Sequence, residues 1–144
     1  MKHYNRENFP VTENLGFFIN RARNLAAAEM DEALKPMDIT SQHVGILLAL
    51  SRGMAHTPYE LSKRLGMDTG LMTRALDKLE VRGLLTRSRS AEDRRVVNLK
   101  LTPMGDDIAG RIPDIASEVL NRRLQGFTKA EFKEFLRLLR KFSG

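Results

Sequence analysis

The residues best suited to chemistry in this chain lie between positions 57 and 105, and they are basic and hydroxyl-bearing side chains. Thr73 and Arg74 fall on one face of an expected helix, and Asp93–Arg95 forms a charged run near an expected turn. Arginine can pair bidentately with guanine in the major groove, and it is attracted to the negative potential of a narrow minor groove. These side chains therefore indicate the reading of duplex DNA.

Other chemistries lack the residues that they need. The chain has no glycine-rich phosphate loop, nucleophile elbow or HExxH helix, so we expect neither enzyme activity nor a cofactor. The histidines, His3, His43 and His56, show no paired ligand spacing, so we expect no metal site. The adjacent Asp106 and Asp107 would point to different faces of a helix. The absence of Cys excludes disulfides, thiolate metal sites and thiol redox sensing.

Positive charge is concentrated in the middle of the chain. Of the total net charge of +6, residues 40–101 carry +5, because they hold eleven Lys and Arg against six Asp and Glu. Such an excess is typical of a nucleic-acid binder, although a solvated basic surface would give the same count. The chain lacks an apolar run of about 18 residues and an apolar signal core, so we expect no membrane span, no secretion and a cytoplasmic location.

Capping residues and glycine stops divide this central part into helices and strands. Thr40, Thr57 and Asp68 can each cap a helix, and Glu60 can complete a capping box with Thr57. Apolar residues with a period of two then indicate a half-buried strand that ends at Leu101. The expected elements are helices over 40–51, 57–65 and 68–82, strands over 84–89 and 94–101, and a hairpin tip over 90–93.

Longer helices flank the central part on both sides. An apolar stripe with helical spacing indicates a first helix over 12–34, which Thr12 can cap. Pro113 lies within an expected helix over 102–126 and should kink or restart it. Thr128 begins a second capping box and opens the last helix. The pattern predicts a mainly α fold with a small β-wing, the layout of a winged helix-turn-helix.

Residues 72–105 resemble a known family. The string MTRALDKLEVRGLLTRSRSAEDRRVVNLKLTPMG is similar to the signature of MarR-type transcriptional regulators. The similarity lies in the TRxLDxLExRGLL run, the DRR wing tip and the LTxxG entry to the next helix, and the order of elements fits over essentially the whole chain. The resemblance implies a winged helix-turn-helix over 40–101 between dimerisation helices in 1–39 and 102–144. It also implies a homodimer that binds a palindromic double-stranded DNA operator.

The expected DNA contacts combine this resemblance with the residue types. Thr69, Thr73 and Arg74 would read bases, and Gly70 would let the helix approach the DNA backbone closely. Lys78 would contact phosphate, which positions the protein without specifying a sequence. The further expected phosphate contacts are Ser41, Ser62 and Lys63.

The wing is expected to make a separate contact. The resemblance implies that Arg95, next to Arg94, inserts into the minor groove, and that Asp93 orients an arginine without touching DNA. The alternatives are a solvated charged turn at the wing and, for Arg74, a salt bridge to Asp77. Either alternative would leave these arginines without a role in recognition.

The outer helices carry more apolar surface than a small winged domain can cover, so we expect a dimer interface there. Its expected members are Leu15, Phe18, Ile19, Phe127, Phe132, Phe135, Leu139 and Phe142. The resemblance also implies release from DNA by a small aromatic or phenolic acid as effector. The expected pocket residues are Arg21, Arg23, His43 and Arg95 for the carboxylate and Phe17, Met37 and Ile46 for an apolar wall. A constitutive repressor without effector, and a winged-helix protein–protein adaptor that does not bind DNA, remain open.

Overall fold

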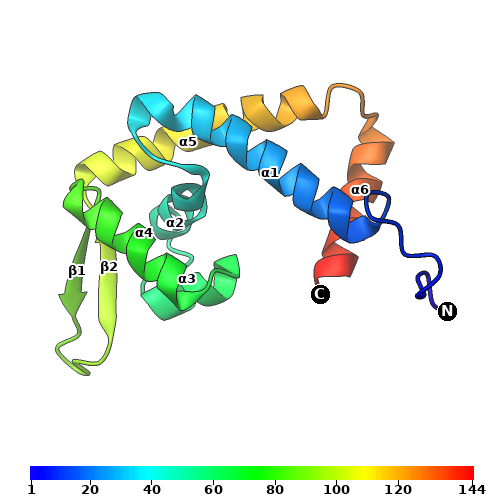
Figure 1. The fold of residues 1–144 in the computed structure, drawn as a ribbon. Coiled ribbons are helices and arrows are strands. Elements are labelled where there is room, and N and C mark those ends of the chain that lie inside the picture. The colour runs from blue at the N-terminus through cyan, green and yellow to red at the C-terminus, as the bar shows by residue number, and fades with distance from the viewer.

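The computed structural model describes residues 1–144. It contains six α-helices and one two-stranded antiparallel ribbon (Figure 1). In chain order the elements are α1 (Leu15–Leu34), the 3-10 turn η1 (Lys35–Met37), α2 (Ser41–Ser51), α3 (Pro58–Leu65), α4 (Thr69–Val81), β1 (Leu85–Arg89), β2 (Val97–Leu101), α5 (Pro103–Arg123) and α6 (Lys129–Ser143). α1 packs on α5 at the top of Figure 1, and the remaining helices of the central part lie below them with the wing. The predicted class, mainly α with a small β-wing, is confirmed.

Most helices begin where the capping residues predicted. Asp68 accepts a hydrogen bond from the backbone N–H of Leu71 at 3.0 Å, which starts α4. Thr128 and Glu131 form a reciprocal capping box at the start of α6, with distances of 3.1 and 2.8 Å. The box at α3 is only half formed, because the Glu60 carboxylate accepts from the Thr57 hydroxyl and not from a backbone N–H.

The predicted cap of the first helix at Thr12 is wrong, since α1 begins after Asn14. The side-chain oxygen of Asn14 accepts from the backbone N–H of Phe17 at 2.9 Å, and its amide donates to the carbonyl of Pro10 at 2.8 Å. Both residue types favour an N-cap. Asn14 can also donate to the preceding segment, which fixes the start of the helix and leaves this residue buried.

The wing differs from its prediction in the length of its loop. β1 and β2 pair from Leu85 with Leu101 to Arg89 with Val97, so both strands start later than expected. The loop closes through hydrogen bonds from Ser90 N–H to Val96 O and from Val96 N–H to Asp93 O, each 2.9 Å. This turn uses the residues at 94–96 that the sequence pattern assigned to the second strand.

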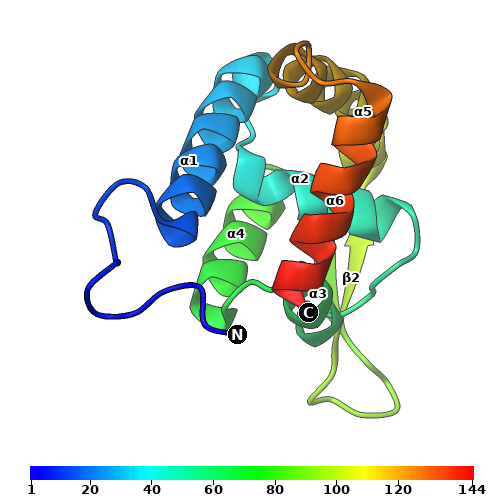
Figure 2. The same cartoon turned by 90° about the vertical axis from the view of Figure 1, so that its right-hand side faces the viewer.

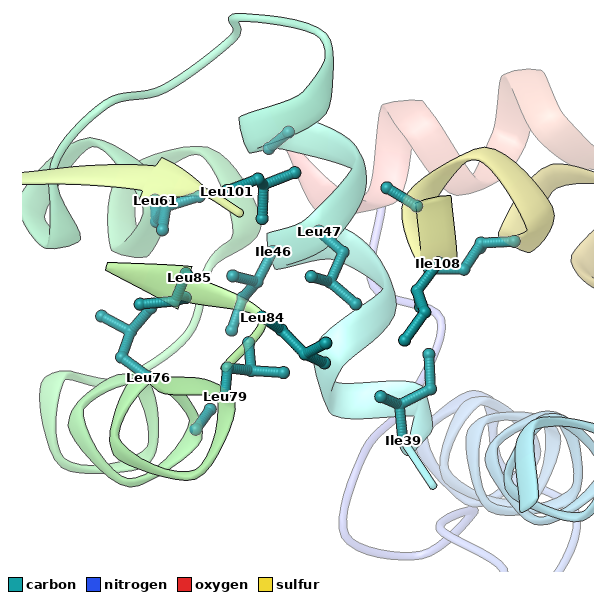
Figure 3. Close-up of a cluster of buried hydrophobic side chains, with 14 of the residues drawn as sticks. Ile39, Ile46, Leu47, Leu61, Leu76, Leu79, Leu84, Leu85, Leu101 and Ile108 are labelled. Atoms are coloured by element: carbon teal, nitrogen blue, oxygen red, sulfur yellow. The ribbon is translucent and has the colours of Figure 1, made fainter. Parts of the chain in front are cut away.

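One apolar core joins the central helices to the wing. The inward faces of α2 and α4 meet the inward residues of β1, β2 and α5 (Figure 3). Leu76 and Leu79 of α4 and Leu84 just before β1 are almost fully buried, as is Ile46 of α2. The residues that were expected to face inward on α4, including Met72 and Ala75, are all buried. The core therefore fixes which face of α4 is left for solvent.

The junction between the wing and α5 is closely packed around Gly105. A Cβ atom at this position would lie 1.9 Å from the backbone oxygen of Leu84. Thr102, the N-cap of α5, donates its hydroxyl to Gly83 O at 2.6 Å and its N–H to Leu84 O at 3.0 Å. Glycine is therefore required where the first turn of α5 crosses the start of the wing.

α5 runs without interruption past Pro113, which corrects the expected restart. Buried residues lie on both sides of the proline, at Ile112 and Val119, and hold the two halves against the core. Tertiary packing therefore outweighs the loss of one backbone hydrogen bond.

α6 lies apart from the core and has no buried residue (Figure 2). Its three phenylalanines, Phe132, Phe135 and Phe142, are between 42% and 62% exposed. No helix in the structure combines the length and apolarity needed to cross a membrane.

Candidate nucleic-acid interface

The outward face of α4 carries an unpaired arginine close to the N-terminal end of the helix. Thr69, Gly70, Thr73 and Arg74 are all exposed there. The Thr73 hydroxyl donates to the carbonyl of Thr69 at 2.8 Å. Arg74 forms no ion pair, and one of its guanidinium nitrogens would lie 3.5 Å from a Cβ at Gly70, so the absence of a side chain there leaves the arginine room. The guanidinium is therefore free to donate to a base edge.

Asp77 does not pair with Arg74, because it pairs with Arg87 of β1 instead. Arg87 Nη2 lies 2.5 Å from Asp77 Oδ1, and Arg87 also contacts Glu80 through Nε and Nη2 at 3.2 Å each. The hydrogen bond from Arg87 holds the pKa of Glu80 below its usual range. Arg87 thus neutralises acidic residues of α4 and ties this helix to the wing.

Sequence reasoning missed Arg87. Two acidic residues three positions apart, followed by an arginine in the next strand, were a usable signal, because residues three apart lie on one helical face.

At the wing tip, Asp93 holds the backbone and the side chain of Arg95. Asp93 accepts from Arg95 N–H at 3.0 Å, from Nε at 3.1 Å and from Nη2 at 3.3 Å. The side-chain hydrogen bond from Arg95 lowers the pKa of Asp93. The Arg95 side chain is still 92% exposed, and Arg94 beside it is exposed as well. Asp93 thus orients an arginine that remains open to solvent.

The remaining basic and hydroxyl residues lie at the edges of this surface. Lys78 is exposed near the C-terminal end of α4, and Lys63 of α3 lies 5.2 Å from the centre of the Tyr59 ring. Ser62 is half-buried. The backbone N–H of Ser41 donates to Asp31 at 2.6 Å, so only its hydroxyl is open to another partner.

The wing tip and the N-terminal end of α4 lie at the same end of the molecule. Both point to the bottom of the picture in the two perpendicular views (Figures 1 and 2). A helix and a loop that project from one side can occupy neighbouring grooves of a duplex. The elements that carry the base-reading and minor-groove candidates, which are about 20 residues apart in sequence, therefore lie at one end of the molecule.

An apolar groove lies at the other side, between α1, α5 and α6. It has a volume of about 470 Å³, and 11 of its 13 lining residues are hydrophobic. Phe18, Phe127, Phe132, Phe135 and Leu139 of the expected interface line it, whereas Leu15, Ile19 and Phe142 lie outside its lining. Leu15 and Phe142 are exposed and Ile19 is half-buried. An apolar surface of this kind usually marks an interaction site.

The structure does not gather the expected effector residues into one cavity. Ile46 is fully buried in the core, and His43 is buried at the start of α2, where its Nδ1 accepts from the backbone N–H of Thr40 at 3.1 Å. Met37 packs against the core. Phe17 is half-buried and contacts Phe18, Arg23 is exposed, and Arg21 lines the apolar groove. Arg21 is therefore the one member of the set that lies in a described cavity.

Burial gives His43 a predictable effect on stability. Desolvation is the largest cause of its lowered pKa, and the nearby Lys78 and Arg82 lower it further. The unfolded chain therefore binds the proton more readily, and stability falls as the pH drops below about 6.5. We expect the free energy of unfolding to decrease from pH 7.5 to pH 5.5 by at most about 1.4 kcal/mol, because pH 5.5 lies about one pH unit below the pKa of an unfolded histidine.

Urea titrations at a fixed protein concentration would measure this decrease. His43→Gln should flatten the dependence, whereas His56→Gln, at an exposed position, should leave it unchanged. An unchanged slope in His43→Gln would show that another group titrates. The carboxylates with lowered pKa titrate below this window.

Comparison with known proteins places this arrangement in a family. The family model described as the MarR family matches residues 39–97, which span α2, α3, α4, β1 and the loop of the wing up to the first residue of β2. The multiple antibiotic resistance protein MarR of Escherichia coli (strain K12) is 32% identical over 110 residues, 76% of this chain and 76% of that protein.

Solved structures agree over nearly the whole chain. Bordetella bronchiseptica BpsR, whose DNA binding is regulated by 6-hydroxynicotinic acid, superposes with a TM-score of 0.84 at 24% identity and covers 94% of this chain and 96% of its own. A mutant MarR from E. coli complexed with operator DNA gives a TM-score of 0.81 at 29% identity, over 93% of this chain and 99% of its own.

Proposed function

This chain belongs to the MarR family of DNA-binding transcriptional regulators, which are not enzymes, and we propose that it is a homodimeric repressor of a palindromic operator. A single observation carries the proposal. Arg74 is exposed on α4 and Arg95 is exposed at the wing tip, and the N-terminal end of α4 and the wing tip lie at the same end of the molecule (Figures 1 and 2), while the apolar groove remains uncovered elsewhere. One protomer thus offers a surface for DNA and a surface for a partner.

The proposed DNA contacts divide into bases, minor groove and phosphates. Arg74, with Thr69 and Thr73, reads base edges in the major groove, and Gly70 allows the close approach. Arg95 enters the minor groove, oriented by Asp93. The phosphate contacts are Lys78, Lys63, Ser62, Ser41 and Arg94. A winged-helix protein–protein adaptor that does not bind DNA would not need Arg74, Arg94 and Arg95 on this surface.

The proposed partner at the groove is a second copy of the chain. Two protomers related by a twofold axis would present two α4 helices to successive turns of the duplex, and a twofold dimer selects a palindrome. In this interface, the aromatic residues of α6 and Phe18 of α1 would be buried away from solvent.

The proposed effector is a small aromatic or phenolic acid. The proposal is supported by BpsR, whose DNA binding responds to 6-hydroxynicotinic acid. Arg21 in the apolar groove supplies the positive charge that a carboxylate needs beside an apolar wall. Because the chain has no Cys, thiol oxidation is not the signal.

Fluorescence anisotropy on purified protein with its own promoter-region DNA tests the function. Two salt concentrations and a panel of aromatic carboxylates separate the alternatives. Palindrome-dependent binding that one acid releases supports the ligand-responsive repressor. Binding that no acid disturbs supports a constitutive repressor, and binding no tighter than to random DNA supports a protein–protein adaptor.

The wing gives a matched pair of variants. We expect Arg95→Ala to lower operator affinity about tenfold, because it removes a charge-assisted contact in the minor groove. Arg94→Ala removes the same charge at the neighbouring position. This variant should weaken binding to operator DNA and to random DNA about equally, and the slope of log affinity against log salt concentration should fall by about 1. Anisotropy titrations at fixed salt measure both effects. Equal losses of specificity in the two variants would remove the separate role of Arg95.

A further inference from the structure

The side chain of Arg82, the C-cap residue of α4, links the C-terminal end of this helix to a distant segment of the chain. Arg82 Nη1 donates to the carbonyl of Asp38, and Nη2 donates to the carbonyl of Met37 at 3.1 Å. Arg82 Nε lies 3.3 Å from a carboxylate oxygen of Asp38. These partners precede Arg82 by 44 and 45 positions in the sequence, so the contact joins two distant segments.

The segment that Arg82 contacts is the link between α1 and α2. Asp38, the C-cap residue that follows η1, has a φ of 53° and is the one non-glycine residue with a positive φ. Carbonyl groups at the end of a helical turn lack partners within the helix, and Arg82 supplies donors to two of them. The side chain of Arg82 is only 24% exposed, so these donors are largely removed from water. Arg82 therefore stabilises both the sharp turn and its position against α4.

A second contact fixes the other side of the same link. The Asp31 carboxylate near the end of α1 accepts from the backbone N–H of Ser41 at 2.6 Å. α1 is thus tied to the first turn of α2, and Arg82 ties the turn between them to α4. The end of the interface helix, the link and the DNA-facing helix meet at this junction.

The chemistry of the contact requires arginine. A planar guanidinium can donate along several directions at once, which matches two carbonyls and one carboxylate. A lysine would keep the charge but offer a single donor group to three acceptors. The junction therefore depends on the geometry of the side chain as well as on its charge.

We propose that Arg82 is a positioning residue that fixes the angle between α4 and α1, and through it the distance between the two α4 helices of a dimer. The inference rests on the proposed homodimer. Its functional consequence is the spacing of operator half-sites that the protein accepts, because each α4 reads one half-site. Arg82 touches no DNA in this role.

Operator spacing provides the first test. Arg82→Ala and Arg82→Lys would be compared with the unmodified protein on the cognate palindrome, on palindromes with one or two base pairs inserted at the centre, and on a single half-site. We expect both variants to lose about tenfold in affinity for the cognate spacing and less for the altered spacings. Affinity for the half-site should stay within about twofold. An equal loss of affinity on all of these DNAs, or no loss on any of them, would overturn the proposal.

A distance measurement tests the same role without DNA. Val81→Cys places one spin label on each protomer, because the chain has no Cys and Val81 is 87% exposed. Double electron–electron resonance should give a narrow distance distribution in the Arg82 background and a broader one with Arg82→Ala or Arg82→Lys. Identical distributions would overturn the proposal. Failure of the unmodified protein to bind any palindrome would instead refute the proposed operator, and this measurement would still decide the role of Arg82.

Thermal melting and sedimentation of each variant separate positioning from folding. Asp38→Gly is the matched control, because glycine accepts the positive φ and leaves both carbonyl acceptors in place. We expect this variant to keep the cognate spacing preference within about threefold. A loss as large as that of Arg82→Ala would assign the effect to the carboxylate pair and overturn the role of the carbonyl contacts.

Discussion

Gly105→Ala is expected to remove most of the stability of the winged domain. The added Cβ would lie 1.9 Å from the carbonyl oxygen of Leu84, a backbone atom that no rotamer change can move. Relief requires α5 to move away from the start of β1, which breaks the hydrogen bonds from Thr102 to Gly83 and Leu84. Overpacking alone costs about 1–3 kcal/mol, and the broken contacts add to it. The sum is a large share of the roughly 5–15 kcal/mol that holds a domain folded.

Gly110→Ala is the matched control, because it makes the same change in the same helix. A Cβ at Gly110 meets nothing within 4 Å, and the residue is exposed. This variant should gain up to about 1 kcal/mol from improved helix propensity. Chemical unfolding followed by circular dichroism measures both variants at one protein concentration. Equal stabilities would mean that the crossing of α5 and the wing can relax.

The second large effect is expected at the apolar groove. Phe135→Glu places a charge in a groove whose lining is hydrophobic at 11 of 13 residues. In a homodimer the charge would be buried twice, and burial of an unpaired carboxylate is costly. We expect a monomer in sedimentation experiments and at least a 100-fold loss of operator affinity, because linkage of two binding sites raises avidity by about 10²–10⁴.

Met104→Glu controls for the introduction of a glutamate at an exposed apolar site. Met104 is 57% exposed and lies on the first turn of α5, outside the groove. A glutamate there is favourable to the helix dipole. Dimerisation and operator binding should therefore be unchanged. A Phe135→Glu protein that remained dimeric would show that partner contacts lie elsewhere.

Apolar spacing and capping residues within short segments of the sequence were enough to predict the helices of the winged helix-turn-helix. The apolar spacing of α4 predicted the burial of Met72, Ala75, Leu76 and Leu79, and so defined the face left for solvent. Asp68 was identified as its cap because its residue type and the following helical pattern agree. Such features depend on neighbours within one or two turns of the chain.

Contacts between distant segments could not be predicted in the same way. Arg82 reaches a turn 44 residues earlier, and nothing within its own helix indicates that partner. The expected strand at 94–101 lost its first residues to a turn, because the side chain of Asp93 organises the loop around Arg95. The first cap was misplaced because Thr12 and Asn14 both suit an N-cap and only the contacts to Pro10 distinguish them.

In the proposed homodimer, the uncovered face of α6 would make the abundance of this protein part of its regulation. Because α6 has no buried residue in the single chain, it would gain its packing from the partner protomer, and the population of paired chains would depend on protomer concentration. Below the dissociation constant of such a pair, doubling the number of protomers quadruples the number of pairs by mass action. Unpaired chains leave their aromatic residues open to chaperones and proteases, which remove the excess. Occupancy of a promoter would then rise more steeply with gene dosage than for a regulator that works as a single chain.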